Sequence, residues 1–110
     1  MNINRKKIEV EINDKKMALV LDFESAIKYQ EAMNESIFVG VQRIGKEMDI
    51  LAFAHLIAST LRDEDDDLVG IDFVKKLDLV GAVDFFMGKI GDLMDNSVPE
   101  AKEKNPKKKK

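Results

Sequence analysis

The sequence predicts a mainly α fold: an N-terminal β-hairpin followed by about five helices and a disordered basic C-terminal tail. Hydrophobic residues alternate with period two from Ile8 to Leu21, and they recur with helical spacing from Asp22 to about Asp95. Residues 99–110 hold six lysines and two prolines but no large apolar side chain, so they cannot offset the entropy of ordering. We therefore expect one globular domain over residues 1–98 and a disordered lysine-rich tail over residues 99–110.

The hairpin is predicted from two alternating runs joined by a turn. Asn13 and Asp14 lie between the runs, and both residue types tolerate a left-handed backbone. Ala18 and Val20 are also apolar, which predicts a second strand covered on both sides. The residues of the main alternating face are Ile8, Val10, Ile12, Met17, Leu19 and Leu21.

The first three helices are each predicted to follow a capping residue: Asp22, Ser36 or Asp49. Asn34-Glu35 should break the chain between the first two helices, and the third should continue to about Arg62. The predicted buried faces are Phe23, Ala26, Ile27 and Met33 in the first helix, Ile37, Val41, Ile44 and Met48 in the second, and Ile50, Phe53, Ala54, Ile57 and Leu61 in the third.

The second half of the domain is predicted to begin with a solvated acidic connection, Asp63–Asp67. Asp72 should then open a short helix, and Asp78 should cap a last helix that continues to about Asp95. The apolar residues of these two helices are Phe73, Val74 and Leu77, then Val83, Phe86, Met87, Ile90 and Met94.

Composition limits the classes of function. The chain has 110 residues and no cysteine, and none of its apolar runs has the roughly 18–20 residues of a membrane span. Its N-terminus has no apolar core of a signal peptide, so we expect a cytoplasmic protein without membrane contact. Residues 1–98 carry 12 basic and 19 acidic side chains, a net charge of −7, and residues 99–110 carry six and two, a net charge of +4. The acidic body disfavours nucleic acid as a partner.

We find no catalytic, cofactor or metal motif in the sequence, and therefore expect a protein that is not an enzyme and binds no cofactor. His55 is the single histidine and is predicted to face solvent. An EF-hand loop starting at Asp63 would need glycine and glutamate where Leu68 and Val74 stand. The glycines match neither a dinucleotide-binding nor a P-loop spacing.

Three apolar residues can serve partner binding. Phe38, Val39 and Phe85 lie off the predicted buried faces of their helices. Either short helices are covered on two sides, or these side chains form an exposed patch for a partner or a second copy.

The chain closes with four consecutive lysines, which form the second candidate site: Lys107, Lys108, Lys109 and Lys110. This run allows three interpretations. It is a solubilising tail, a nucleic-acid arm that lacks stacking aromatics, or the product of an adenine-rich tract on which ribosomes slip.

The order of these features resembles that of the tail assembly chaperones of long-tailed phages and gene-transfer particles. The resemblance lies in the hairpin, in LDFESAIKYQEAMNESIF as helix–break–helix, in DILAFAHLIASTLRDED as a central helix with an acidic turn, and in the closing IDFVKKLDLVGAVDFFMGKI. It covers most of residues 8–95.

This resemblance implies a protein that binds and solubilises the tape measure protein, helps to recruit tail tube protein, and is absent from the mature virion. It also implies a second, longer form made by programmed frameshifting, which the closing KNPKKKK fits. It implies no particular binding residue. Two other functions stay open from the sequence: a small nucleic-acid-binding regulator acting through the lysine tail, and a structural tail or capsid subunit.

Overall fold

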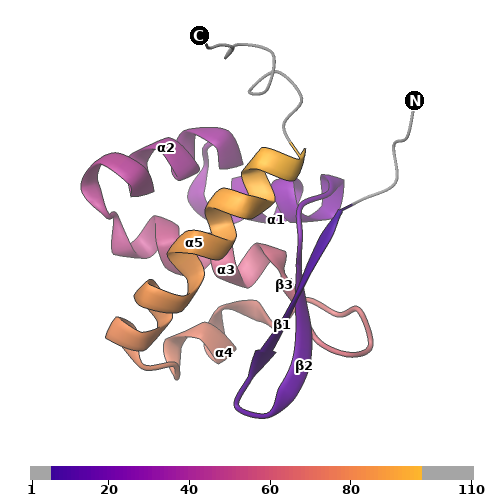
Figure 1. Ribbon diagram of the computed structural model, residues 1–110. Coiled ribbons are helices and arrows are strands. Elements are labelled where there is room, and N and C mark those ends of the chain that lie inside the picture. Colours follow the sequence, from indigo (N-terminus) through magenta and orange to yellow (C-terminus); the bar gives the residue numbers. More distant parts are fainter. Residues whose placement is uncertain (1–5, 98–110) are drawn as a thin grey trace, which may run out of the picture.

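The computed structural model describes residues 6–97, with side chains for residues 6–94. It is mainly helical, with a small antiparallel sheet at one side, as the sequence predicts. Figure 1 shows the longest helix, α5, crossing in front of α3, while the hairpin runs along one side of the molecule. The predicted tail and the boundary at residue 98 lie outside the described residues.

The hairpin consists of β1 (Lys7–Ile12) and β2 (Lys15–Val20), paired so that Val10 faces Met17. Asn13 and Asp14 both have positive φ, at 52° and 66°. Two consecutive left-handed residues make the tight turn whose twist matches the two strands, so the predicted turn is confirmed. Val10, Met17, Leu19 and Val20 are buried.

Helix α1 (Phe23–Met33) begins at the predicted cap, where the Asp22 carboxylate accepts the Ser25 N–H at 3.0 Å. Its predicted buried face is wrong in part, because Phe23 is 85% and Ile27 53% exposed. Ser25 and Tyr29 are buried instead. The hydroxyl groups of both residues have hydrogen-bond partners, so these polar side chains can be buried. The periodicity of apolar residues gives no information about such partners.

Helices α2 (Ile37–Glu47) and α3 (Ile50–Thr60) also start at their predicted caps, Ser36 and Asp49. Helix α3 packs against α1, α2, α4 and β2, and most of its side chains from Ala52 onward are buried. Ile50, a predicted core residue, is 47% exposed, whereas Leu56 is buried although it lies off the predicted stripe. A central helix has neighbours on several sides, so one stripe underestimates its buried surface.

The predicted end of the central helix at about Arg62 is wrong. Helix α3 ends at Thr60, and Leu61–Arg62 form the short strand β3, which pairs with β2 in the order β1-β2-β3. Leu61 lies opposite Leu19 and Arg62 opposite Ala18. The pairing of residues about 40 positions apart decides this change of direction, because the exposed edge of β2 offers backbone partners that the sequence near Leu61 does not show.

The short helix α4 (Gly70–Lys75) begins two residues before Asp72, so the predicted cap at Asp72 is wrong. The Val69 N–H donates to the Leu61 carbonyl at 3.0 Å, and Gly70 turns the chain with φ of 82°. Helix α5 (Leu79–Ser97) does begin after its predicted cap: the Asp78 carboxylate accepts the Gly81 N–H at 2.7 Å.

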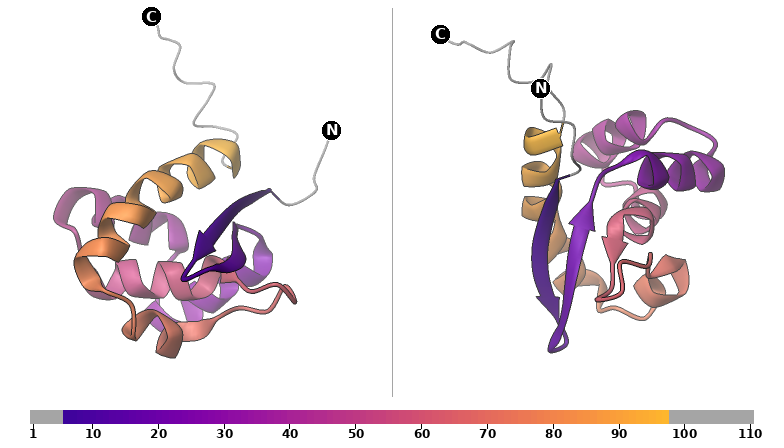
Figure 2. Two further views of the ribbon diagram at one scale, coloured as in Figure 1. Left: turned by 60° about the horizontal axis from the view of Figure 1, so that its bottom comes forward. Right: turned by 90° about the vertical axis from the view of Figure 1, so that its right-hand side faces the viewer.

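The sheet and all five helices contribute side chains to the core. Figure 2 shows α5 and the hairpin on the same side of α3. Phe86, Ile90 and Leu93 of α5 are buried there. Among the described residues, none of the helices combines the length and the apolar character that crossing a membrane requires.

Candidate functional site

The predicted partner-binding residues Phe38 and Val39 lie in the first turn of α2. Ser36 caps this helix by accepting the Phe38 N–H at 3.1 Å, and the helix turns Ile37, Gly40 and Ile44 inward. Phe38 is 50% and Val39 48% exposed, so the described part of the chain leaves both side chains accessible. Their role in binding stays a prediction.

Phe85, the third predicted residue, is half-buried. Its ring meets Phe86 edge-on with centroids 5.0 Å apart, and Lys89 Nζ lies 5.1 Å from its centroid. It lines an open depression of about 190 Å³ between the start of α5 and the hairpin turn at Ile12 and Asn13. Figure 1 places α2 at the opposite end of the molecule from that turn, so Phe85 does not share one surface with Phe38 and Val39.

The second candidate site of the sequence, the closing lysine run, is not placed by the structure. Lys107, Lys108, Lys109 and Lys110 all lie outside the described residues, which end at Ser97. The three interpretations of this run therefore stay predictions.

Exposed apolar residues follow a pattern that the sequence prediction missed. Four helices place large apolar side chains in the first turn after a capping residue, and only Ile27 of the exposed group lies further along its helix. The cap residues Asp22, Ser36, Asp49 and Asp78 are a signal that would have located them. The exposed group consists of Phe23, Ile27, Phe38, Val39, Ile50, Leu51, Leu79 and Val80.

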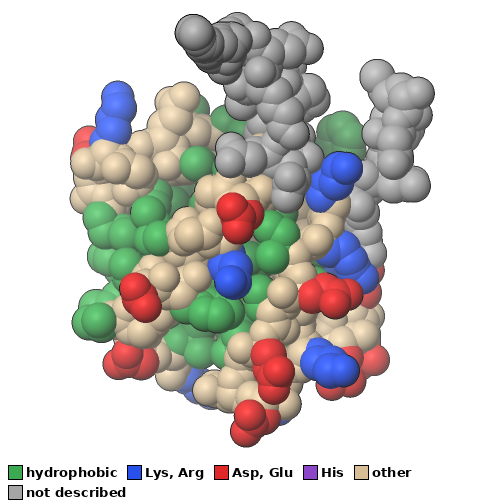
Figure 3. Space-filling view, viewed as in Figure 1, with side chains coloured by type: hydrophobic (Ala, Val, Ile, Leu, Met, Phe, Trp, Pro, Cys, Tyr) green, Lys and Arg blue, Asp and Glu red, His purple; other side chains and the backbone are tan. Residues whose placement is uncertain are grey.

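Figure 3 shows hydrophobic side chains gathered on one side of this face, over α2, the start of α3 and the first half of α5. Acidic and basic side chains lie both around that region and between its hydrophobic side chains. The body is therefore an acidic domain that still presents apolar side chains to solvent. Such a surface is suited to contacts with another protein.

A first polar cluster, here the Arg43 cluster, joins α1, α2 and the start of α3. The Arg43 guanidinium forms a bidentate pair with Glu35, at 2.5 and 2.7 Å, and contacts Asp49 at 2.9 Å. The Tyr29 hydroxyl donates to Glu35 at 2.7 Å. The Tyr29 ring lies against α2 at Gly40, where an added Cβ would overlap the phenol oxygen.

The electrostatics of the Arg43 cluster follow from these contacts. Hydrogen bonds from Arg43 and Tyr29 hold the pKa of Glu35 below its ordinary value. Hydrogen bonds from the Ala52 N–H and from Arg43 do the same for the pKa of Asp49. Burial and the Glu35 carboxylate raise the pKa of Tyr29 well above its ordinary value, so its phenol stays protonated.

A second polar cluster, the Arg62 cluster, joins β3 to the start of α1. Arg62 is 3% exposed; it contacts Asp22 at 2.9 Å and Glu24 at 3.0 Å. Ser25 Oγ donates to the Val20 carbonyl at 2.7 Å and ties the end of β2 to the same place. Within the described residues, Arg62 Nε is the one buried side-chain polar atom that lacks a hydrogen-bond partner.

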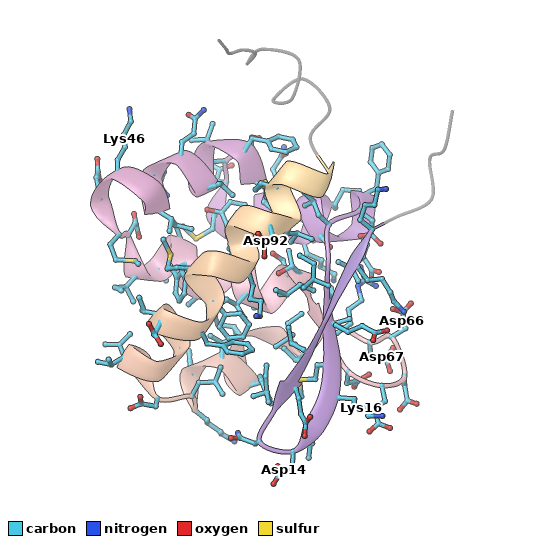
Figure 4. The ribbon with its side chains drawn as sticks, viewed as in Figure 1. Asp14, Lys16, Lys46, Asp66, Asp67 and Asp92 are labelled. Carbon is cyan, nitrogen blue, oxygen red and sulfur yellow. The ribbon has the colours of Figure 1, made fainter. Side chains whose placement is uncertain are left out.

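Among the described residues, the acidic connection brings carboxylates together at a spacing that metal ligands can have. Side-chain oxygens of Asp63, Asp65 and Asp67 lie within 4.8 Å of one another. Asp63 Oδ1 already accepts the N–H groups of Asp65 and Asp67, at 2.9 and 3.1 Å, which closes the loop without an ion. In Figure 4, the Asp66 and Asp67 side chains point outward from this loop.

The remaining candidates, His55 and a charged groove, do not lie together in one site. His55 is half-buried on α3 rather than facing solvent, and no cluster of metal-ligand type within the described range includes it. A broad open groove between the hairpin and the acidic connection is lined by both signs of charge, including Lys7, Lys16, Glu9 and Asp63.

Comparison with known protein families, with curated proteins and with solved structures finds no match for this chain. The class that fold and surface define is a mainly α domain with an N-terminal hairpin and solvent-exposed apolar residues on an acidic body.

Proposed function

We propose that this protein is a phage tail assembly chaperone that binds the tape measure protein in the host cytoplasm and keeps it soluble during tail assembly. The observation that carries the proposal is the coexistence of exposed apolar side chains with a net charge of −7 over residues 1–98. Apolar side chains can cover hydrophobic segments of a client, and the charge keeps the complex soluble. The layout of the chain, which resembles that of these chaperones, supports the same function.

Phe38 is the best candidate for a client anchor. It is an aromatic side chain, half exposed, on a helix whose other face is fixed in the core by Ile37 and Ile44. A rigid aromatic group loses little entropy when it binds, and aromatic residues dominate binding energies at interfaces. Val39 lies beside it and enlarges the apolar contact.

The decisive experiment is co-expression with the tape measure protein encoded by the same genome. We expect the protein to raise the soluble yield of that partner and to co-purify with it. The double variant Phe38→Ser, Val39→Ser should weaken binding by about tenfold or more, because loss of an interface anchor typically costs about 2 kcal/mol. Gln42→Ser, Lys46→Ser is the matched control on the same helix, since both residues are exposed and polar.

Several results would contradict the proposal. A tape measure protein that stays insoluble in the presence of this chain removes the chaperone function. Recovery of the chain in purified particles favours a structural subunit. Tight, salt-sensitive DNA binding that disappears when residues 102–110 are removed favours the regulator, because the lysine tail is the basic segment available for counterion release.

The proposal includes a longer form produced by frameshifting at the lysine run. We expect Lys107–Lys110 to be encoded by an adenine-rich slippery tract, with an open shifted frame past the stop codon. The extension would then add a surface for the tail tube protein. Nucleotide sequence around the stop codon tests this directly, and shifted frames that close within a few codons would exclude the longer form.

A further inference from the structure

Two helices place their exposed apolar first turns at the same end of the molecule. Because Val69 donates to the Leu61 carbonyl, α4 starts beside the end of α3 and packs back along it. The chain then begins α5 at the same end of the molecule where α3 began. Figure 1 and the left view of Figure 2 both show the starts of α3 and α5 at this end.

This end of the molecule, here called the aliphatic end, carries four exposed aliphatic side chains. Ile50 is 47% and Leu51 61% exposed at the start of α3; Leu79 is 57% and Val80 76% exposed at the start of α5. Leaving four such side chains in water forgoes the free energy that their burial would contribute. Apolar side chains exposed together at one end of a domain mark an interaction surface more often than scattered single residues do.

The described ends of the chain lie elsewhere. Ser97 ends a helix of 19 residues that starts at Leu79, and at 1.5 Å per residue this places it about 27 Å away. Lys7, at the other end, pairs with Val20 close to the start of α1. Within residues 6–97, the aliphatic end is therefore left uncovered.

Charge favours a second copy of this chain over a partner of uniform charge. The body as a whole is acidic, which would keep two copies apart. Exposed residues of both signs stand near the four aliphatic residues in the chain, however, so the local charge is close to balanced: Lys46, Lys75 and Lys76 against Glu47, Asp72, Asp78 and Asp84. Two-fold symmetry can place the lysines of one copy against the acids of the other.

We propose that the first turns of α3 and α5 form a symmetric interface with a second copy of this chain, with Leu51 and Val80 at its centre. Its four side chains belong to α3 and α5, so they are different residues from the proposed client anchors Phe38 and Val39 of α2. The inference does not depend on the proposed function, because it concerns the protein alone.

The test is the molar mass of the purified full-length chain, measured by light scattering and sedimentation up to millimolar concentration. Wild type should form a dimer in a concentration-dependent manner. Leu51→Lys, Val80→Lys should raise the dissociation constant about 100-fold or more, because two apolar side chains are lost and charge is buried. Phe23→Lys, Ile27→Lys is the matched control: equally many exposed apolar residues change, on α1, and the dimer should persist.

A charge exchange tests the two-fold arrangement. Lys76→Asp alone should weaken the dimer, and adding Asp84→Lys should restore it. Circular dichroism and thermal melting show whether each variant folds, and Val80→Ser provides a milder substitution if the lysine variant does not. Monomeric wild type at every concentration overturns the proposal, as does a dimer that the α1 variant disrupts as strongly as the α3/α5 variant.

Discussion

The Arg43 and Arg62 clusters have the same chemistry but differ in burial. Each guanidinium contacts two carboxylates, yet the Arg43 side chain is 27% exposed and the Arg62 side chain 3%. Arg43 keeps access to water on one side, so the loss of one partner can be offset by solvent. Arg62 lacks this alternative, and a lost partner leaves an uncompensated charge in the protein interior.

The two clusters also differ in which parts of the structure they connect. The Arg62 cluster joins β3 to α1, residues about 40 positions apart, and therefore fixes tertiary structure. The Arg43 cluster connects residues six to eight positions apart and fixes the path between consecutive helices. We expect the first to dominate global stability and the second to set the local geometry of α2.

The largest effect should follow from Asp22→Ala. The change removes the carboxylate that accepts from Nη2 of the buried Arg62, and it removes the cap of α1; together these losses should cost about 3–5 kcal/mol. Urea unfolding measures it. Glu24→Ala is the control, since this partner is 56% exposed and its loss should cost at most about 1 kcal/mol. Equal losses in the two variants would refute the assignment of Asp22 as the main partner of the buried Arg62 guanidinium.

The next effect concerns the packing of Tyr29 on α2. A Cβ at Gly40 would overlap the Tyr29 hydroxyl and ring, so Gly40→Ala should destabilise the fold by about 1–3 kcal/mol. Gly45→Ala is the matched change on the same helix. Nothing lies within 4 Å of its added methyl group, so it should stabilise the helix by about 0.5–1 kcal/mol. A neutral Gly40→Ala would show that Tyr29 is not held against α2.

The pH dependence of stability should reveal the Arg43 cluster. Because the native pKa values of Glu35 and Asp49 are lowered, their contribution is complete above the ordinary carboxyl values, about 4, and is lost as pH falls through the native values. Unfolding free energy should therefore decrease below about pH 4–5, and Glu35→Gln should reduce that slope. In an Arg43→Met background, Glu35→Gln should have a smaller effect on the slope, as a double-mutant cycle can measure.

The smallest effect should come from Phe23→Ser. This residue was predicted to be buried, but its side chain is 85% exposed, and no core contact is lost. The change should alter the unfolding free energy by less than about 0.5 kcal/mol. A loss of several kcal/mol in urea unfolding would mean that Phe23 packs in the native state after all.

Turn and cap residues in the sequence predicted much of the secondary structure of this protein. Asn13-Asp14 takes the left-handed backbone that closes the hairpin, and Asp22, Ser36, Asp49 and Asp78 cap helices at the predicted positions. Turns and caps depend on hydrogen bonds between residues at most about four positions apart, so they can be predicted from the sequence. The exposure of Phe38 and Val39 was one of two open interpretations, because periodicity describes one helix and not its neighbours.

Tertiary contacts decided the rest. Leu61–Arg62 form a strand because they pair with the edge of β2. Ser25 and Tyr29 are buried because the Val20 carbonyl and the Glu35 carboxylate accept hydrogen bonds from their hydroxyl groups. Arg62, an ordinary charged residue in the sequence, became the most deeply buried charge of the described chain because α1 brings two carboxylates to it. The free energy of burying a polar group depends on partners distant in sequence, and only the folded chain brings them together.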